Sequence, residues 1–196
     1  MILEGLITTR AAAGTPHLAA LGPEVDPRAL REGALAELVL KPFASSHTAA
    51  NLATTPAGVF HTTDDVLVLA RCVAGVGPPP ALVPAEAVPG WRLADACGAW
   101  EFSVVEADRS AGRQRLVARV ERFHAGRPFH GHVRARHAIV EGAILVSRLQ
   151  LLGAEEVRAG LETLRVLVEK TGDAEAREAF AILVERASRP PAPRVD

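Results

Sequence analysis

The chain has 196 residues, of which 48% are hydrophobic and 23% charged, and its formal net charge is −1. This composition is typical of a folded globular protein, and the balanced charge provides no general attraction to nucleic acid or to an acidic membrane. With six Phe, two Trp and no Tyr, the sequence also lacks the aromatic platform that single-stranded nucleic acids need.

The cysteine content and the apolar runs indicate the cellular compartment in which the protein is expected. Cys72 and Cys97 cannot form a disulfide framework and fit a reducing environment. The apolar start of the chain contains Glu4 and has no basic leader, and the apolar run 138–146 is interrupted by Glu141. We therefore expect a cytoplasmic protein with no membrane and no nucleic acid among its partners.

The first part of the chain has the short apolar runs of β-strands. Residues 2–10 and 15–22 are separated by Gly14, which predicts a hairpin with Pro16 at the start of its second strand. Further strands are predicted at 35–40 and 57–63. Residues 66–73 then follow a helical period, with Thr63 or Asp64 as the cap and Gly75 beyond the end.

A proline-rich segment and a long hairpin follow. The prolines within 77–90 predict a rigid surface loop without regular structure. Alternating patterns at 100–108 and 115–123, joined by a Gly-containing turn, predict two paired strands. Five or six short strands with hairpin connections are typical of a small antiparallel barrel.

After Pro128 the period becomes helical. A buried helix is predicted at 134–152, an amphipathic one at 154–170, and a third beginning after Asp173. The sequence therefore predicts a β-barrel domain over 1–127, a three-helix domain over 128–189 and a disordered tail over 190–196.

The segment KPFASSHTAANL, residues 41–52, places hydroxyl groups at the start of a short predicted helix. If Ser45 or Ser46 is the N-cap, the free backbone N–H groups of the first turn and the nearby hydroxyls converge at the positive end of the helix dipole. Lys41 or His47 can add a full charge. A phosphate group would satisfy all of these donors at once, and the alternative is a surface helix whose hydroxyls serve only its own cap.

The chain resembles an uncharacterised family of split-barrel proteins that bind flavin mononucleotide (FMN), distantly similar to flavin reductases and to pyridoxamine-phosphate-oxidase-like barrels. The resemblance rests on the order and spacing of segments over most of the chain rather than on one strong motif. These segments are ILEGLITTR, GTPHLAALGP, KPFASSHTAANL, HTTDDVLVLAR, DACGAWEF, RPFHGHVRARHAIVEGAIL and LVEKTG.

The resemblance implies an α+β fold with a split antiparallel β-barrel of the FMN-binding type, followed by the three-helix segment. It also implies a homodimer that holds FMN between or beside the two protomers. Ser45, Ser46 and Thr48 would donate hydrogen bonds to the phosphate, Asn51 would brace the loop or reach the ribityl chain, and His61 would lie near the isoalloxazine ring.

Some positions depart from the family pattern. His47 stands where the family has a small hydroxyl residue, and a histidine can itself donate to phosphate. His130 and His132 stand where aromatic residues are expected, and Val133 where Asn is expected. No role is therefore transferred to residues 130–133.

The remaining candidates have weaker patterns. His124, His130, His132 and His137 lie within a short stretch, but they span several predicted elements, and we predict no metal site. Patterns for nucleophilic catalysis and for dinucleotide binding are absent. The sequence thus predicts an FMN-binding flavoprotein, acting as a flavin-dependent oxidoreductase of unknown substrate. The alternative is a non-catalytic dimeric binding or assembly protein that uses the barrel pocket for another phosphorylated ligand.

Overall fold

The computed structural model describes residues 1–189, so the tail predicted for 190–196 lies outside the described residues. The chain divides into two compact units. We call Met1–Thr63 with Pro80–Phe129 the sheet unit, and Asp64–Pro79 with the described residues from His130 onward the helical unit. The division near residue 129 lies close to the predicted boundary, whereas the sequence assigns 64–79 to the first domain.

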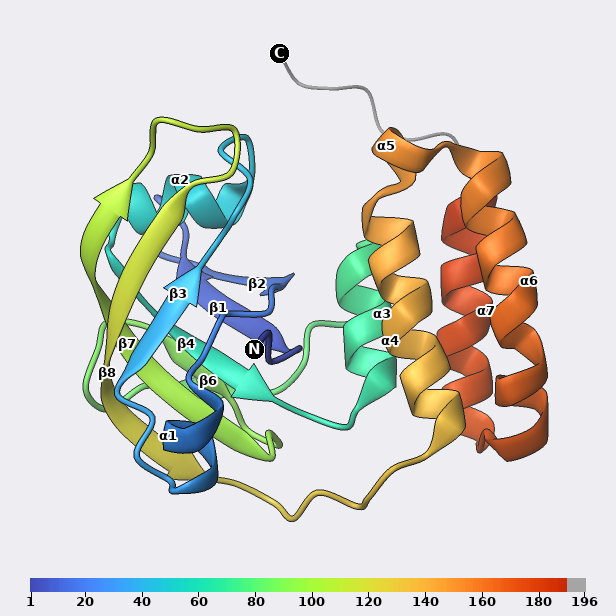
Figure 1. The fold of residues 1–196 in the computed structure, drawn as a ribbon, viewed down its shortest axis with the longest axis horizontal. Coiled ribbons are helices and arrows are strands. Elements are labelled where there is room, and N and C mark those ends of the chain that lie inside the picture. Colours follow the sequence, from blue (N-terminus) through green and yellow to red (C-terminus); the bar gives the residue numbers. More distant parts are fainter. Residues whose placement is uncertain (190–196) are drawn as a thin grey trace. The chain divides into compact units, whose positions relative to one another are not determined.

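Six antiparallel strands form the main sheet of the sheet unit, in the order β2-β1-β4-β7-β8-β3 (Figure 1). The predicted hairpins β1–β2 and β7–β8 are both present. Pro16 opens β2 at the edge of the sheet, where its missing N–H interrupts no ladder. The strands are β1 Leu6–Arg10, β2 Pro16–Ala20, β3 Glu37–Leu40, β4 Ala57–Thr62, β7 Gly98–Asp108 and β8 Arg115–Ala125.

The sheet curls around one apolar core. Glu24 forms isolated bridges with Val39 on the edge strand β3 and with Ile2 ahead of β1, which brings the two sides of the sheet toward each other. Fully buried side chains from five strands fill the interior, among them Ile7, Leu38, Phe60, Phe102 and Leu116. The chain thus forms the antiparallel barrel that its alternating patterns predict.

Two helices belong to this unit. The five-residue helix α1, Pro27–Arg31, is absent from the sequence prediction and is capped by Asp26, whose carboxylate accepts from the Arg28 N–H at 2.8 Å. The second helix, α2, spans His47–Thr54 as predicted and packs on β1 and β2. Its buried residues include Ala49 and Leu52, so its apolar side is joined to the barrel.

The proline-rich segment contains regular structure, so the prediction of a loop over 77–90 is wrong for 82–84. Strand β5, Leu82–Pro84, pairs with β6, Trp91–Leu93, in a separate two-stranded sheet. A strand with only one partner tolerates proline, because one of its sides makes no ladder bonds. Strand β6 contacts β1 and β4, and Val88 packs with Val59 and Ala99 on the sheet face opposite the core.

Five helices form the helical unit, and residues 64–79 pack with its C-terminal part. The apolar side of α3 contacts α4 and α7. Residues 64–79 therefore belong to the helical unit, although barrel strands precede and follow them in sequence. The helix predicted over 134–152 is interrupted where the Arg148 N–H closes α4 on the Leu145 carbonyl at 3.0 Å. The helices are α3 Val66–Ala74, α4 Arg134–Ser147, α5 Leu149–Leu152, α6 Ala154–Thr171 and α7 Ala174–Ser188.

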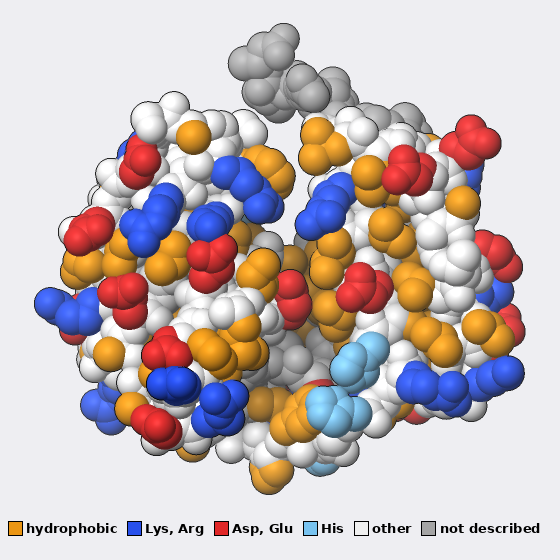
Figure 2. Space-filling view, in the orientation of Figure 1, with side chains coloured by type: hydrophobic (Ala, Val, Ile, Leu, Met, Phe, Trp, Pro, Cys, Tyr) orange, Lys and Arg blue, Asp and Glu red, His pale blue; other side chains and the backbone are white. Residues whose placement is uncertain are grey.

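The start of α3 also differs from the prediction. Its cap is Asp65, whose carboxylate accepts from the N–H groups of Leu67 and Val68, rather than Thr63 or Asp64. Asp64 is instead buried and accepts from Arg136 at 2.9 Å. Within residues 1–189, none of the helices is long and apolar enough to cross a membrane. On the face drawn in Figure 2, acidic and basic side chains are interspersed.

Candidate functional site

The first turn of α2 is capped by Ser46. The Ser46 hydroxyl donates to the Phe43 carbonyl at 2.7 Å and accepts from the Ala49 N–H at 3.2 Å. This side chain therefore satisfies the end of its own helix, as an N-cap does. Ser45, which precedes it, is exposed.

Thr48 differs from Ser46 in having no partner. The residue as a whole is only 3% exposed, and its hydroxyl makes no hydrogen bond to any described residue. Since this oxygen is not among the fully buried side-chain atoms that lack a partner, it is accessible from solvent. The backbone N–H groups of His47 and Thr48 likewise have no acceptor among the described residues. Helical side chains tilt toward the N-terminus, so the hydroxyl and these two N–H groups lie at the same end of α2. They are donors available to an anion at the positive end of the helix dipole.

Asn51 and Lys41 make contacts that restrict their roles. The Asn51 amide donates to the Thr9 hydroxyl on β1 at 2.9 Å, so Asn51 ties α2 to the barrel. The Lys41 ammonium lies 2.5 Å from a Glu24 carboxylate oxygen. This hydrogen bond holds the pKa of Glu24 below its usual range. The charge of Lys41 is therefore already paired in this structure.

A second histidine, His17 on β2, lies beside His47. The two ring centroids are 5.5 Å apart and the rings are tilted by 56°. No sequence pattern groups these two residues, because their pairing depends on how α2 packs on β2. Partial burial, and then the charge of His47, lower the pKa of His17.

His61 is fully buried and both of its ring nitrogens are used. Its Nδ1–H donates to the Leu6 carbonyl at 3.2 Å, and its Nε2 accepts from the Leu93 N–H at 3.1 Å. Together these partners fix the neutral Nδ1–H tautomer. Burial, and then the nearby charge of Arg92, lower the pKa of His61 to about 4. In this structure His61 joins β4 to β1 and β6, with no ring nitrogen left for a ligand.

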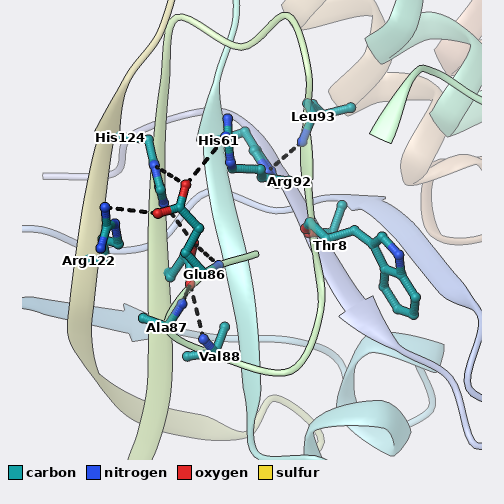
Figure 3. Close-up of polar contacts among 11 residues, drawn as sticks. Thr8, His61, Glu86, Ala87, Val88, Arg92, Leu93, Arg122 and His124 are labelled. Atoms are coloured by element: carbon teal, nitrogen blue, oxygen red, sulfur yellow. Dashed lines mark hydrogen bonds and ion pairs between the residues drawn. The ribbon is translucent and has the colours of Figure 1, made fainter. Parts of the chain in front are cut away.

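A polar cluster that the sequence did not predict lies on the same face of the sheet (Figure 3). It is centred on Glu101 of β7, whose side chain is 0% exposed. Its carboxylate accepts from the N–H groups of Glu86, Ala87 and Val88 at 2.8, 2.5 and 3.0 Å. Glu101 thereby fastens the segment between β5 and β6 onto the sheet.

His124 and Glu86 extend this cluster. His124 Nε2 lies 2.7 Å from Glu101 Oε1, and Glu86 lies between Arg122 and His124, which come from β8 (Figure 3). Burial alone would raise the pKa of Glu101, but the three N–H groups and His124 outweigh it, so its pKa lies below the usual range. The carboxylate is thus kept charged by donors from the protein itself.

The cluster has the contacts of a structural clamp. A carboxylate–imidazole pair could serve in acid–base chemistry, but here every named group is paired within the protein. In the sequence, Glu101 is a charged residue within the alternating strand WEFSVVEAD. Such a residue fits a solvent-facing position equally well, so the pattern does not indicate a buried cluster. Only the folded 84–90 segment makes this position buried.

The other three histidines of the predicted group lie in the helical unit. His132 Nδ1 is 3.3 Å from His137 Nε2, and the backbone N–H of His130 donates to Asp64 at 3.1 Å. Among the described residues, no three His, Cys, Asp or Glu side chains are arranged to hold a metal ion.

An open pocket of about 590 Å³ lies elsewhere in the sheet unit, between the N-terminus, α1 and β3. It contains none of the residues of the predicted phosphate site. Glu24, Asp26 and Glu37 line it, and these three carboxylates make it unsuitable for a phosphate group. This pocket is thus separate from the first turn of α2, the candidate anion site.

The fold defines a class, the split-barrel proteins of the FMN-binding type. The chain belongs to the DUF447 family: residues 3–126 match the N-terminal domain of this "protein of unknown function (DUF447)" and residues 133–185 match its C-terminal part. The predicted family and fold class are confirmed. No curated protein matches the sequence.

Solved structures show the same fold at low identity. An FMN-bound DUF447 protein from Methanosarcina mazei is 18% identical, with a TM-score of 0.76 over 94% of each chain. Component B of nitrilotriacetate monooxygenase from Bacillus cereus is 16% identical, with a TM-score of 0.51 over 68% of this chain and 75% of its own. Flavoredoxin of Desulfovibrio vulgaris is 12% identical, with a TM-score of 0.51 over 63% of this chain and 69% of its own.

Proposed function

We propose that this protein binds FMN and that the first turn of α2 binds its phosphate. The observation that carries the proposal is Thr48, a residue that is 3% exposed and whose accessible hydroxyl has no partner among the described residues. A phosphate would accept from this hydroxyl and from the free N–H groups of His47 and Thr48. None of α2, β1 and β2 contains an Asp or Glu that would oppose it.

The relatives support the same ligand. The Methanosarcina mazei protein of this family is FMN-bound and matches nearly the whole chain. In the proposed site Ser45, His47 and Thr48 contact the phosphate, Ser46 caps the helix, and Asn51 holds it on β1. Lys41 and His61 keep their contacts with Glu24 and with the backbone of Leu6 and Leu93.

We also propose that the protein is a cytoplasmic homodimer that catalyses a flavin-dependent redox reaction. The likeness in fold to a monooxygenase component and to a flavoredoxin supports this class of reaction. Bound FMN would supply the electron-transfer or hydride-transfer chemistry. This chain would supply the phosphate donors and the rigid placement of α2 on the barrel.

Replacing Thr48 by Val tests the phosphate site. Valine has the same shape and removes only the hydroxyl, so the fold should be retained. A hydrogen bond to a charged group contributes about 1.5–3 kcal/mol, so we expect FMN to bind at least about tenfold more weakly. Riboflavin, which lacks the phosphate, should bind the variant as it binds the wild type. Titration of flavin fluorescence measures both.

The matched control is Thr54→Val at the other end of α2. The Thr54 hydroxyl bonds to the Ala50 carbonyl of its own helix and is exposed. FMN affinity should be unchanged in this variant. Equal FMN affinity in wild type and Thr48→Val would show that the phosphate lies elsewhere. A protein that binds neither flavin would support the alternative, a non-catalytic binding protein for another ligand.

A further inference from the structure

Two histidines lie at the end of α2 where the proposed phosphate donors are. His47 is the first residue of α2, and His17 lies on β2, one of the two strands on which α2 packs. Their ring centroids are 5.5 Å apart. Neither ring is hydrogen-bonded to another described residue, so ring nitrogens of both remain available.

The one charged residue on β1, the strand paired with β2, is basic. Arg10 ends β1, and the Arg113 guanidinium lies 4.5 Å from the centre of the Phe43 ring, just before α2. Arg109 donates to the Leu52 carbonyl, toward the opposite end of α2, and Lys41 is paired with Glu24. No carboxylate is present on α2, β1 or β2 to stabilise protonated imidazoles.

Protonation of His17 is therefore disfavoured when no anion is bound. Burial and the neighbouring His47 lower the pKa of His17. Two imidazolium ions at this distance repel each other, and the positive end of the helix dipole adds to the repulsion. A bound phosphate dianion would instead favour protonation of the imidazoles, because an opposite charge at close range stabilises their charged form.

We propose that His17 and His47 act together as a proton-coupled part of the phosphate site, so that binding of FMN takes up protons from solvent. This inference rests on the proposed function and adds His17 to the site. Each imidazolium N–H would donate to a phosphate oxygen. FMN is then retained more strongly at pH 6.5 than at pH 8.5, since the protons needed for binding are scarcer at the higher pH.

The test is the dissociation constant of FMN at pH 6.5, 7.5 and 8.5, with riboflavin titrated in parallel. The phosphate is mainly dianionic across this range, because its second pKa is about 6. Uptake of one proton changes affinity by at most tenfold per pH unit. We expect FMN to bind wild type roughly tenfold more weakly at pH 8.5 than at pH 6.5, and riboflavin affinity to stay constant.

Variants identify the residues responsible. His17→Gln and His47→Gln remove the titrating groups but keep a polar side chain, so each should reduce the pH dependence of FMN binding and the double variant should abolish it. The matched control is His137→Gln in the helical unit, whose pH dependence should equal that of wild type. Calorimetry in buffers of different ionisation enthalpy directly counts the protons taken up when FMN binds. If the role of His17 were purely structural, His17→Gln would not change this number.

The possible failures are distinct. If FMN binds more tightly than riboflavin but with no pH dependence, the proton-coupled pair is wrong while the phosphate site stands. If the two flavins bind equally well, both the pair and the placement of the phosphate are wrong, although flavin binding stands. If neither flavin binds at any pH, the proposed function and this inference both fail.

Discussion

Replacing Glu101 by Gln is expected to lower the free energy of unfolding of the sheet unit by about 3 kcal/mol. The carboxylate is buried and accepts three backbone N–H groups from the segment 86–88 as well as a hydrogen bond from His124. A glutamine turns an NH₂ group toward these donors and leaves some of them unsatisfied. Removing one member of a buried charged network typically costs about 3–5 kcal/mol.

Tryptophan fluorescence during denaturant unfolding measures this effect, because Trp91 and Trp100 both belong to the sheet unit. The control is Glu106→Gln, an exposed position farther along the same strand, which should change stability by less than about 0.5 kcal/mol. Amide hydrogen exchange at Ala87 and Val88 should also become faster in Glu101→Gln only. Similar stabilities for the two variants would mean that Glu101 does not fasten the segment.

The elements that sequence patterns predicted correctly are those in which local signals agree with the final packing. The hairpin around Gly14, the strands β7 and β8, and the helices α6 and α7 all show clear alternation or helical periodicity. Helix α1 was missed because its five residues are too few to show a period. The β5–β6 hairpin was missed because prolines normally indicate a loop. A strand tolerates proline only where one of its sides is unpaired, and the sequence does not show that β5 has such a side.

The partner of a helix cannot be read from its own period. The apolar side of α3 would suit either the barrel or the other helices, and the structure packs it against α4 and α7. The same limit applies to the sites. The cap at Ser46 could be predicted from local spacing, whereas the pairing of His17 with His47 depends on which strands α2 covers.

The Glu101 cluster was hidden for a related reason. Along β7, Trp100 and Phe102 face the core, so the alternation assigns Glu101 to the solvent-facing side. Its burial results from the 84–90 segment, which is distant in sequence and has no pattern of its own. A bulge between Glu101 and Phe102 further shifts the register with β8, so the pairing with His124 could not be counted from the turn.

Lowering the pH from 7.5 to 5 is expected to destabilise the sheet unit through His61. The pKa of His61 is about 4 in the folded protein and 6.5 is its ordinary value, so between these values the unfolded chain binds more protons. Stability is therefore fully present above pH 6.5 and falls as the pH decreases toward 4. Since one pKa unit corresponds to 1.36 kcal/mol, the complete effect is about 3 kcal/mol.

Unfolding free energies of wild type and His61→Gln across this pH range test the effect. We expect His61→Gln to be less stable than wild type at pH 7.5, because it loses the hydrogen bonds with Leu6 and Leu93. The difference in unfolding free energy between the two proteins should shrink by about 2 kcal/mol at pH 5. The control is His17→Gln. Since His17 is only partly buried, its loss should alter the dependence of unfolding free energy on pH less than the loss of His61 does. Parallel curves for wild type and His61→Gln would contradict a neutral, buried His61 joining β4 to β1 and β6.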